Sequence, residues 1–151
     1  EKKIYYKYIM SFYTFDFSSL PIIKIKLEGR VTLEKVDGFL NKWLEIYDLD
    51  TKHTLIFDMT KTHSPTIKSA IKLAKFIKKV KMEKPQLLER SFLIINENSL
   101  LRYLFRMVFT ITRPIAPIFV YWKKPIETHI NPDTILNVFH TNALKFQYIR
   151  Q

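Results

Sequence analysis

Three residues that lie close together in the sequence have side chains suited to nucleophilic catalysis. Asp58 ends a short apolar stretch, and His63 and Ser64 follow shortly after it. A carboxylate can orient an imidazole, which in turn can activate a serine hydroxyl. Such a nucleophile needs small neighbours, however, and Pro65 follows Ser64 directly. We therefore favour the interpretation that Ser64 caps a helix and that His63 is a loop residue, with a hydrolytic site as the alternative.

Other kinds of site have little support from residue types and spacing. The chain has no cysteine, which removes thiolate nucleophiles, disulfides and cysteine zinc sites. Its four histidines show no metal-ligand spacing. Two glycines, Gly29 and Gly38, are too few for a glycine-rich phosphate loop. We expect no catalytic residues, no metal and no cofactor.

The composition indicates a folded and strongly basic protein. Of the 151 residues, 47% are hydrophobic and 26% are charged, which is typical of a globular chain. We expect one domain over residues 1–151, with a core at about 22–139, N-terminal strands within 3–17 and a tail at 140–151. The net charge of +11 favours anionic partners. An AT-rich genome, which favours Lys codons, is an equal explanation for that charge.

The sequence also gives expectations about location. The absence of cysteine suits a reducing compartment, so we expect a cytoplasmic protein. The chain begins with Glu1 rather than Met, so we expect that a preceding segment is missing, and the mature chain of an organelle is the alternative. The most apolar region, residues 100–121, contains three arginines and two prolines, which argues against a membrane-spanning helix.

Hydrophobic periodicity predicts strands that alternate with helices. We expect strands at 4–10, 13–17, 22–29, 54–59, 91–95 and 115–122, and helices at 31–49, 65–83, 100–111 and 131–140. The tail at 142–151 is either an added strand or a frayed end. This order predicts an α/β fold with a single mixed sheet of about five to six strands, parallel in its middle and antiparallel near the N-terminus.

Several local signals support these boundaries. Thr32 is the expected N-cap of the first helix, and Ser64 followed by Pro65 predicts the start of the second. The stretch 60–64 is expected to be a polar loop. The expected core face of the second helix consists of Ile67, Ala70, Ile71, Ala74, Ile77 and Val80. In the last helix, Ile135, Leu136 and Phe139 are expected to point inward.

The pattern of elements resembles a known family. The stretch IKLEGRVTLEKVDGFL, a strand that ends in Gly before a helix, and TLIFDMT, a strand that ends in Asp before a hydroxyl residue, resemble the STAS domains of bacterial anti-sigma-factor antagonists. The later SFLII, LLRYLFRMV and APIFVYW resemble the branch that shares its fold with CRAL-TRIO lipid-transfer domains. The resemblance covers about residues 22–139.

This resemblance implies a protein-interaction role and points to the start of the second helix. Phosphorylatable STAS domains carry Asp-Ser and then Gly there, whereas this chain has HSPTIKSA. Ser64 and Thr66 lie near that position and are the candidate phosphorylation sites. The resemblance also allows a lipid pocket, although this chain leaves little room for the additional helices of CRAL-TRIO domains.

Two helices carry the candidate contact residues. The second helix has lysines at helical spacing, namely Lys68, Lys72, Lys75 and Lys79, and no acid beside them until Glu83. Like charges at this spacing repel one another, so the stripe is either an anion-binding face or an ordinary solvated face. The third helix is apolar nearly all round, which favours burial on more than one side. Its expected partner contacts are Leu101, Tyr103, Phe105, Met107 and Phe109, with Arg102, Arg106 and Arg113 as anion contacts. Coverage by the N-terminal strands or the tail is the alternative.

From these features we expect a non-enzymatic, STAS-like protein-interaction module that binds a protein partner or forms a homo-oligomer within a larger assembly. The alternative is a peripheral membrane or lipid-binding protein, related to the CRAL-TRIO fold, that contacts an anionic membrane or lipid. Nucleic acid is not favoured as a partner because no nucleic-acid-binding signature is present.

Overall fold

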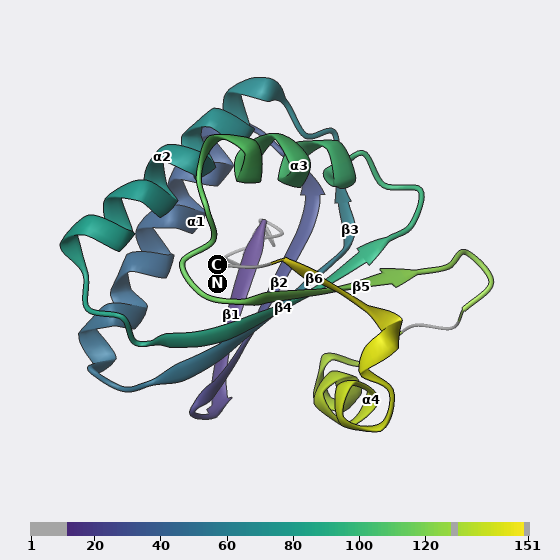
Figure 1. Ribbon diagram of the computed structural model, residues 1–151. Coiled ribbons are helices and arrows are strands. Elements are labelled where there is room, and N and C mark those ends of the chain that lie inside the picture. Colours follow the sequence, from purple (N-terminus) through teal and green to yellow (C-terminus); the bar gives the residue numbers. More distant parts are fainter. Residues whose placement is uncertain (1–11, 128–129, 150–151) are drawn as a thin grey trace, which may run out of the picture.

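A single mixed sheet of six strands organises the chain in the computed structural model, which describes residues 12–127 and 130–149. The strands are β1 (Tyr13–Ser19), β2 (Ile22–Arg30), β3 (His53–His63), β4 (Leu88–Asn96), β5 (Ile118–Lys123) and β6 (Phe146–Ile149). They lie side by side in chain order, with β2 to β5 parallel and the two edge strands antiparallel to their neighbours (Figure 1). The predicted fold class is confirmed. The strand predicted at 4–10 lies outside the described residues.

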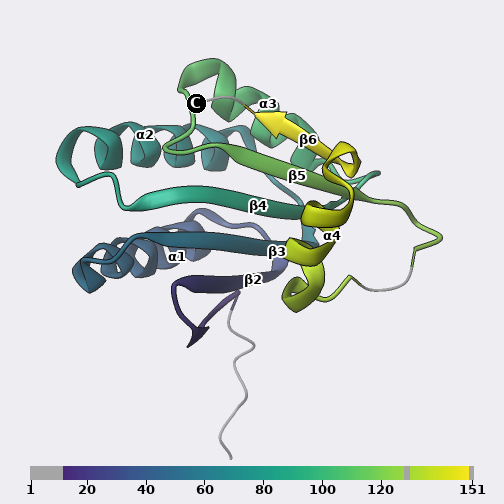
Figure 2. The same cartoon turned by 60° about the horizontal axis from the view of Figure 1, so that its bottom comes forward.

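Three of the four α-helices in the described part of the chain cover one face of the sheet. They are α1 (Leu33–Ile46), α2 (Ile67–Glu83) and α3 (Leu101–Ile111), whereas α4 (Ile135–Thr141) lies on the opposite face (Figures 1 and 2). Each of the three connects parallel strands that are direct neighbours, and each crossover steps in the same direction across the sheet. Right-handed crossovers in one direction place their helices on one side.

The hydrophobic pattern of the strands agrees with this layering. Ile23, Ile25 and Leu27 of β2 are buried under the helices, as their alternation predicts. In β3, neighbouring residues are buried on both faces: Leu55 belongs to the core under α1 to α3 and Ile56 to the core under α4. A continuous apolar run is what a strand covered on both faces requires.

Strand β3 is longer than its apolar run. The polar loop predicted at 60–64 is wrong, because the strand continues to His63 and pairs again with β2 through Lys61–Glu28, Thr62–Gly29 and His63–Arg30. A β-bulge between the two paired segments shifts the register. In this second segment Lys61 and His63 are exposed, whereas Thr62 is buried and donates a hydrogen bond to the Leu27 carbonyl.

The helix starts confirm one predicted cap and correct another. Thr32 caps α1, as predicted, by accepting a hydrogen bond from the backbone N–H of Lys35. The predicted Ser64 cap of α2 is wrong. Thr66 is the N-cap, and it forms a reciprocal capping box with Ser69: Thr66 Oγ1 accepts from Ser69 N at 3.1 Å, and Ser69 Oγ accepts from Thr66 N at 3.0 Å. Ser64 and Pro65 precede the helix.

Two hydrophobic cores lie on the two faces of the sheet. The larger one, under α1 to α3, contains an aromatic cluster in which Trp43 contacts both Phe57 and Phe76. The smaller one, under α4, contains Phe92, fully buried Ile135 and Phe146, with Leu136 and Phe139 packed against it. The inward positions predicted for α4 are therefore confirmed. The added-strand option for the tail is also confirmed, because β6 pairs with β5.

Candidate functional site

Of the three side chains of the alternative hydrolytic site, Asp58, His63 and Ser64, only the last two contact each other. The Asp58 carboxylate is buried and accepts hydrogen bonds from Thr60, at 3.0 Å from its backbone N and 2.7 Å from its Oγ1. His63 is exposed and lies five residues further along the same strand, about 16 Å away if fully extended. Its Nδ1 is 3.1 Å from Ser64 Oγ. Among the described residues, His63 therefore contacts Ser64, but the Asp58 carboxylate does not orient its imidazole.

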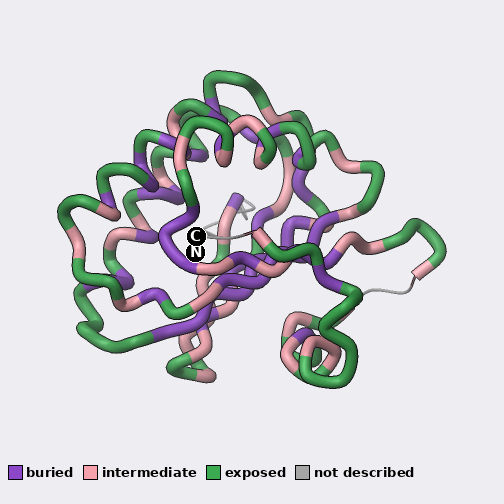
Figure 3. The backbone as a smooth tube through the Cα atoms, in the orientation of Figure 1, coloured by how far each residue is buried: buried purple, intermediate pink, exposed green. Residues whose placement is uncertain are grey.

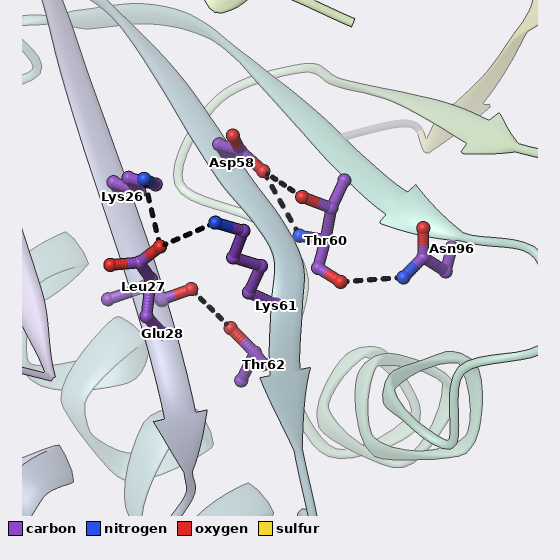
Figure 4. A network of polar contacts seen from close by, with 8 residues as sticks. All are labelled: Lys26, Leu27, Glu28, Asp58, Thr60, Lys61, Thr62 and Asn96. Atoms are coloured by element: carbon purple, nitrogen blue, oxygen red, sulfur yellow. Dashed lines mark hydrogen bonds and ion pairs between the residues drawn. The ribbon is translucent and has the colours of Figure 1, made fainter. Parts of the chain in front are cut away.

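The polar residues at this end of the sheet instead hold the irregular part of β3 (Figure 4). Asn96 of β4 donates from its amide to the Thr60 carbonyl at 2.6 Å, and Thr62 donates to the Leu27 carbonyl at 2.7 Å. On the other side, the Glu28 carboxylate lies 2.8 Å from the Lys26 ammonium and 3.5 Å from that of Lys61. The Lys26 hydrogen bond is the main cause that holds the pKa of Glu28 below its ordinary value.

A shallow polar recess lies beside this network, between the ends of β3 and β4. Its lining includes Lys61, His63, Ser64, Asn98 and Ser99. Ligands of open α/β sheets bind where the strand order reverses, because a crevice opens there between helices on opposite faces. The order β2-β3-β4-β5 has no such reversal. The recess is therefore a weaker candidate than the surfaces of α2 and α3.

The lysine stripe of α2 is only partly free. Lys68, Lys75 and Lys79 are exposed, and no acid among the described residues forms an ion pair with them. Lys72 is half-buried and forms an ion pair with Asp37 of α1. Lys72 therefore helps to join two helices, whereas the other three remain available for contact.

Apolar residues occur on three sides of helix α3, and each side has different surroundings. Leu101, Leu104 and Val108 are buried against the core. Leu101, predicted as a partner contact, is only 2% exposed, so it lies beneath the surface that a partner could reach. A second side faces the start of α2, and a third faces β5 and β6. Arg113 lies beyond the end of the helix and is exposed.

The side of α3 that faces α2 carries an exposed apolar patch. Tyr103 is 64% exposed, Leu100 60%, and Ile67 of α2 64%, although Ile67 was predicted to be buried. With Pro65 and Met107 they surround a hollow of about 190 Å³. We call these five residues the α2–α3 patch. The outward sides of both helices are largely exposed (Figure 3).

Sequence periodicity did not reveal this patch, because it placed Ile67 and Ile71 on the core face. Four predicted core residues are buried, namely Ala70, Ala74, Ile77 and Val80. The prediction is wrong for Ile67 and for Ile71, which is 39% exposed, and the core face includes Ser69 and Phe76 instead. The residue that periodicity missed is Ser69, a polar residue that is buried and whose hydroxyl takes part in the capping box with Thr66.

The candidate phosphorylation sites differ in their surroundings. Both Ser64 and Thr66 are exposed. Ser64 has a backbone φ of +57°, in the left-handed region, and its hydroxyl contacts His63. The Thr66 hydroxyl is used by the capping box, and it borders the α2–α3 patch.

Comparison with known proteins does not assign the chain to a family. No protein-family model matches the sequence, and a search of curated proteins finds no significant match. Within the described residues, no helix has the length and apolarity needed to cross a membrane, and no cluster of three or more metal-ligating side chains is found.

Proposed function

We propose that this chain is a non-enzymatic interaction module that binds an acidic protein partner through the α2–α3 patch. The observation that carries the proposal is the exposed apolar surface of Ile67, Leu100 and Tyr103. Helix α2, which supplies Ile67, also carries Lys68, Lys75 and Lys79, for which no described acid forms an ion pair. Exposed apolar residues that cluster in this way mark interaction sites more often than isolated ones do. The STAS resemblance supports the same role.

The chemistry of the patch favours a central apolar contact with a charged rim. Tyr is enriched among the residues that dominate binding energy at interfaces, and Tyr103 lies at the hollow between the two helices. Lys68 and Lys75 would contribute mainly to the association rate and to specificity, as charges at a rim do.

An acidic partner fits this surface better than a second copy of the chain. A two-fold symmetric interface brings the same patch of both subunits together. Such an interface would contain Lys68 and Lys75 from both copies, and an excess of like charge at an interface is unfavourable. The net charge of +11 adds to this repulsion.

The proposal is tested by capture and then by titration. Immobilised protein is incubated with an extract of its native source, and each captured protein is purified and titrated by calorimetry. We expect an acidic protein that binds with a defined stoichiometry, more weakly at high salt, and at least about tenfold more weakly to Ile67→Ser and Tyr103→Ser. The matched control is Ile111→Ser, which changes an isoleucine of similar exposure (57%) at the other end of α3.

The same variants separate the alternatives. If light scattering detects a dimer that Ile67→Ser abolishes, the partner of the patch is a second copy of the chain rather than an acidic protein. If the protein floats with anionic vesicles and both Ile67→Ser and Tyr103→Ser abolish this flotation, the partner is a membrane surface. Titrations in which both patch variants behave like Ile111→Ser would contradict the proposal.

A further inference from the structure

The third side of α3 borders a second surface feature, a groove between this helix and strands β5 and β6. Its volume is about 500 Å³. Each crossover helix connects two parallel strands, and the last of them, α3, leads into β5, whereas β6 joins β5 in the antiparallel direction and in the described residues brings no further helix to that face. The floor is formed by Ile95, Val120 and Ile149, and the α3 wall by Phe105 and Phe109. We call it the α3–β6 groove.

We propose that the α3–β6 groove binds a fatty carboxylate, with the carboxylate at Arg102 and Arg106 and the hydrocarbon chain along the apolar floor. The inference goes beyond the proposed protein contact, because the groove lies on a different side of α3 from the α2–α3 patch.

Charge supports an anionic head group. Arg102 and Arg106 lie one turn apart and both line the groove, and no acidic side chain does so among the described residues. Neither arginine forms an ion pair with a described acid. A guanidinium presents a planar set of donors that matches a carboxylate in a two-point contact.

The position of Arg102 is supported by its neighbours. Its guanidinium lies over the Trp122 ring, 4.7 Å from the ring centroid. The Trp122 Nε1 in turn donates a hydrogen bond to the Gln147 side-chain oxygen at 2.8 Å. These contacts hold one end of the groove in place before a ligand arrives, which lowers the entropic cost of binding.

The shape of the groove supports a chain rather than a compact ligand. From Arg102 to Thr110 the α3 wall is about 12 Å long at the helical rise per residue. A volume of about 500 Å³ lies within the range of small-molecule sites. Phe105 and Phe109 also line a smaller apolar hollow of about 80 Å³ on their other side, so the two hollows share these rings.

The test is a calorimetric titration of the purified protein with sodium laurate below its micelle concentration. We expect one laurate per chain and binding that is at least about tenfold weaker in Arg102→Gln with Arg106→Gln. The matched control is Lys75→Gln with Lys79→Gln, which removes the same charge from the exposed face of α2 and should leave the affinity unchanged.

Two further ligands test the head group and the chain. Dodecanol, which has no carboxylate, should bind at least about tenfold more weakly than laurate. Decanoate should also bind more weakly, by about fourfold for each methylene removed. Fluorescence provides an independent readout, because Trp122 lines the groove whereas Trp43 is buried in the core. The laurate-induced change should disappear in Trp122→Phe while calorimetry still detects binding.

Several results would overturn the inference. Equal affinity for dodecanol and laurate would show that the groove does not recognise the carboxylate. An equal loss of laurate affinity in the arginine and lysine double variants would show nonspecific attraction to a basic protein. Binding of anionic vesicles with no binding of free laurate would mean that the surface contacts a membrane rather than a single fatty carboxylate.

Discussion

At the residue scale, the start of α2 depends on Thr66 rather than on Ser64. Thr66 and Ser69 satisfy each other's backbone N–H groups, and Ser69 is almost fully buried. The sequence Ser-Pro-Thr contains two residues that can cap a helix. Which one does so depends on where β3 ends, and β3 ends at His63 because of its pairing with β2. Local cap signals do not contain that information.

The first prediction is that Thr66→Ala lowers the free energy of unfolding by about 1 kcal/mol, because it removes the N-cap acceptor. Ser64→Ala, the control, should change it by less than about 0.5 kcal/mol, since Ser64 precedes the helix. Urea denaturation of the two variants measures both values. A larger loss in Ser64→Ala than in Thr66→Ala would contradict the capping box.

At the scale of elements, the small helix α4 closes the second face of the sheet. It is attached through fully buried Ile135 and through Lys24 of β2, which forms an ion pair with Asp133 just before the helix. The second prediction is therefore a loss of about 2–5 kcal/mol in Ile135→Ala, from lost burial and the cavity left behind.

The matched control for this prediction is Ile126→Ala. Ile126 lies in the loop after β5 and is 91% exposed, so the same atoms are removed without a cavity, and the change should stay below about 0.5 kcal/mol. Thermal or urea unfolding compares the two. Similar values for both variants would mean that α4 does not stabilise the sheet.

The helices and strands were largely predictable from the sequence, but the residues that pack against each helix were not. Alternation in Ile23, Ile25 and Leu27 and the apolar run of β3 are direct consequences of burial on one or both faces. The neighbours of α3 could not be predicted in the same way. Its apolar residues are shared among the core, the α2–α3 patch and the α3–β6 groove, and periodicity counts apolar positions without saying what covers each one.

The candidate sites show the same limit. The lysine spacing of α2 identified exposed Lys68, Lys75 and Lys79 correctly, but the ion pair that engages Lys72 requires Asp37, which is distant in the sequence. Likewise, Arg102 and Trp122 come from different elements, and only the packing of α3 above β5 brings them together.

At the scale of the whole molecule, stability should decrease from the centre of the sheet towards its edges. Strands β3 and β4 have neighbours on both sides and buried residues on both faces, whereas β6 is a short edge strand with two exposed residues. Local opening requires less free energy where fewer contacts are lost.

The third prediction follows from this gradient. In hydrogen-exchange mass spectrometry, peptides that cover residues 54–58 and 91–95 should exchange at least about tenfold more slowly than those that cover 144–149. Measurement without and with laurate adds a control, because a ligand in the α3–β6 groove should slow exchange in β6 and leave β1 unchanged. Equal protection of β4 and β6 would contradict the gradient.

The uninterrupted chain order of the sheet also has a consequence for how the protein folds. Each parallel strand from β3 to β5 pairs with the strand that precedes it in the chain, so every new unit of strand and helix can join an edge that already exists. Neighbouring strands are therefore also consecutive in the sequence. This keeps the sequence separation of contacts moderate for a parallel sheet, which favours faster folding. During synthesis from the N-terminus, the growing edge would remain open until β6 arrives in the opposite direction and ends the series.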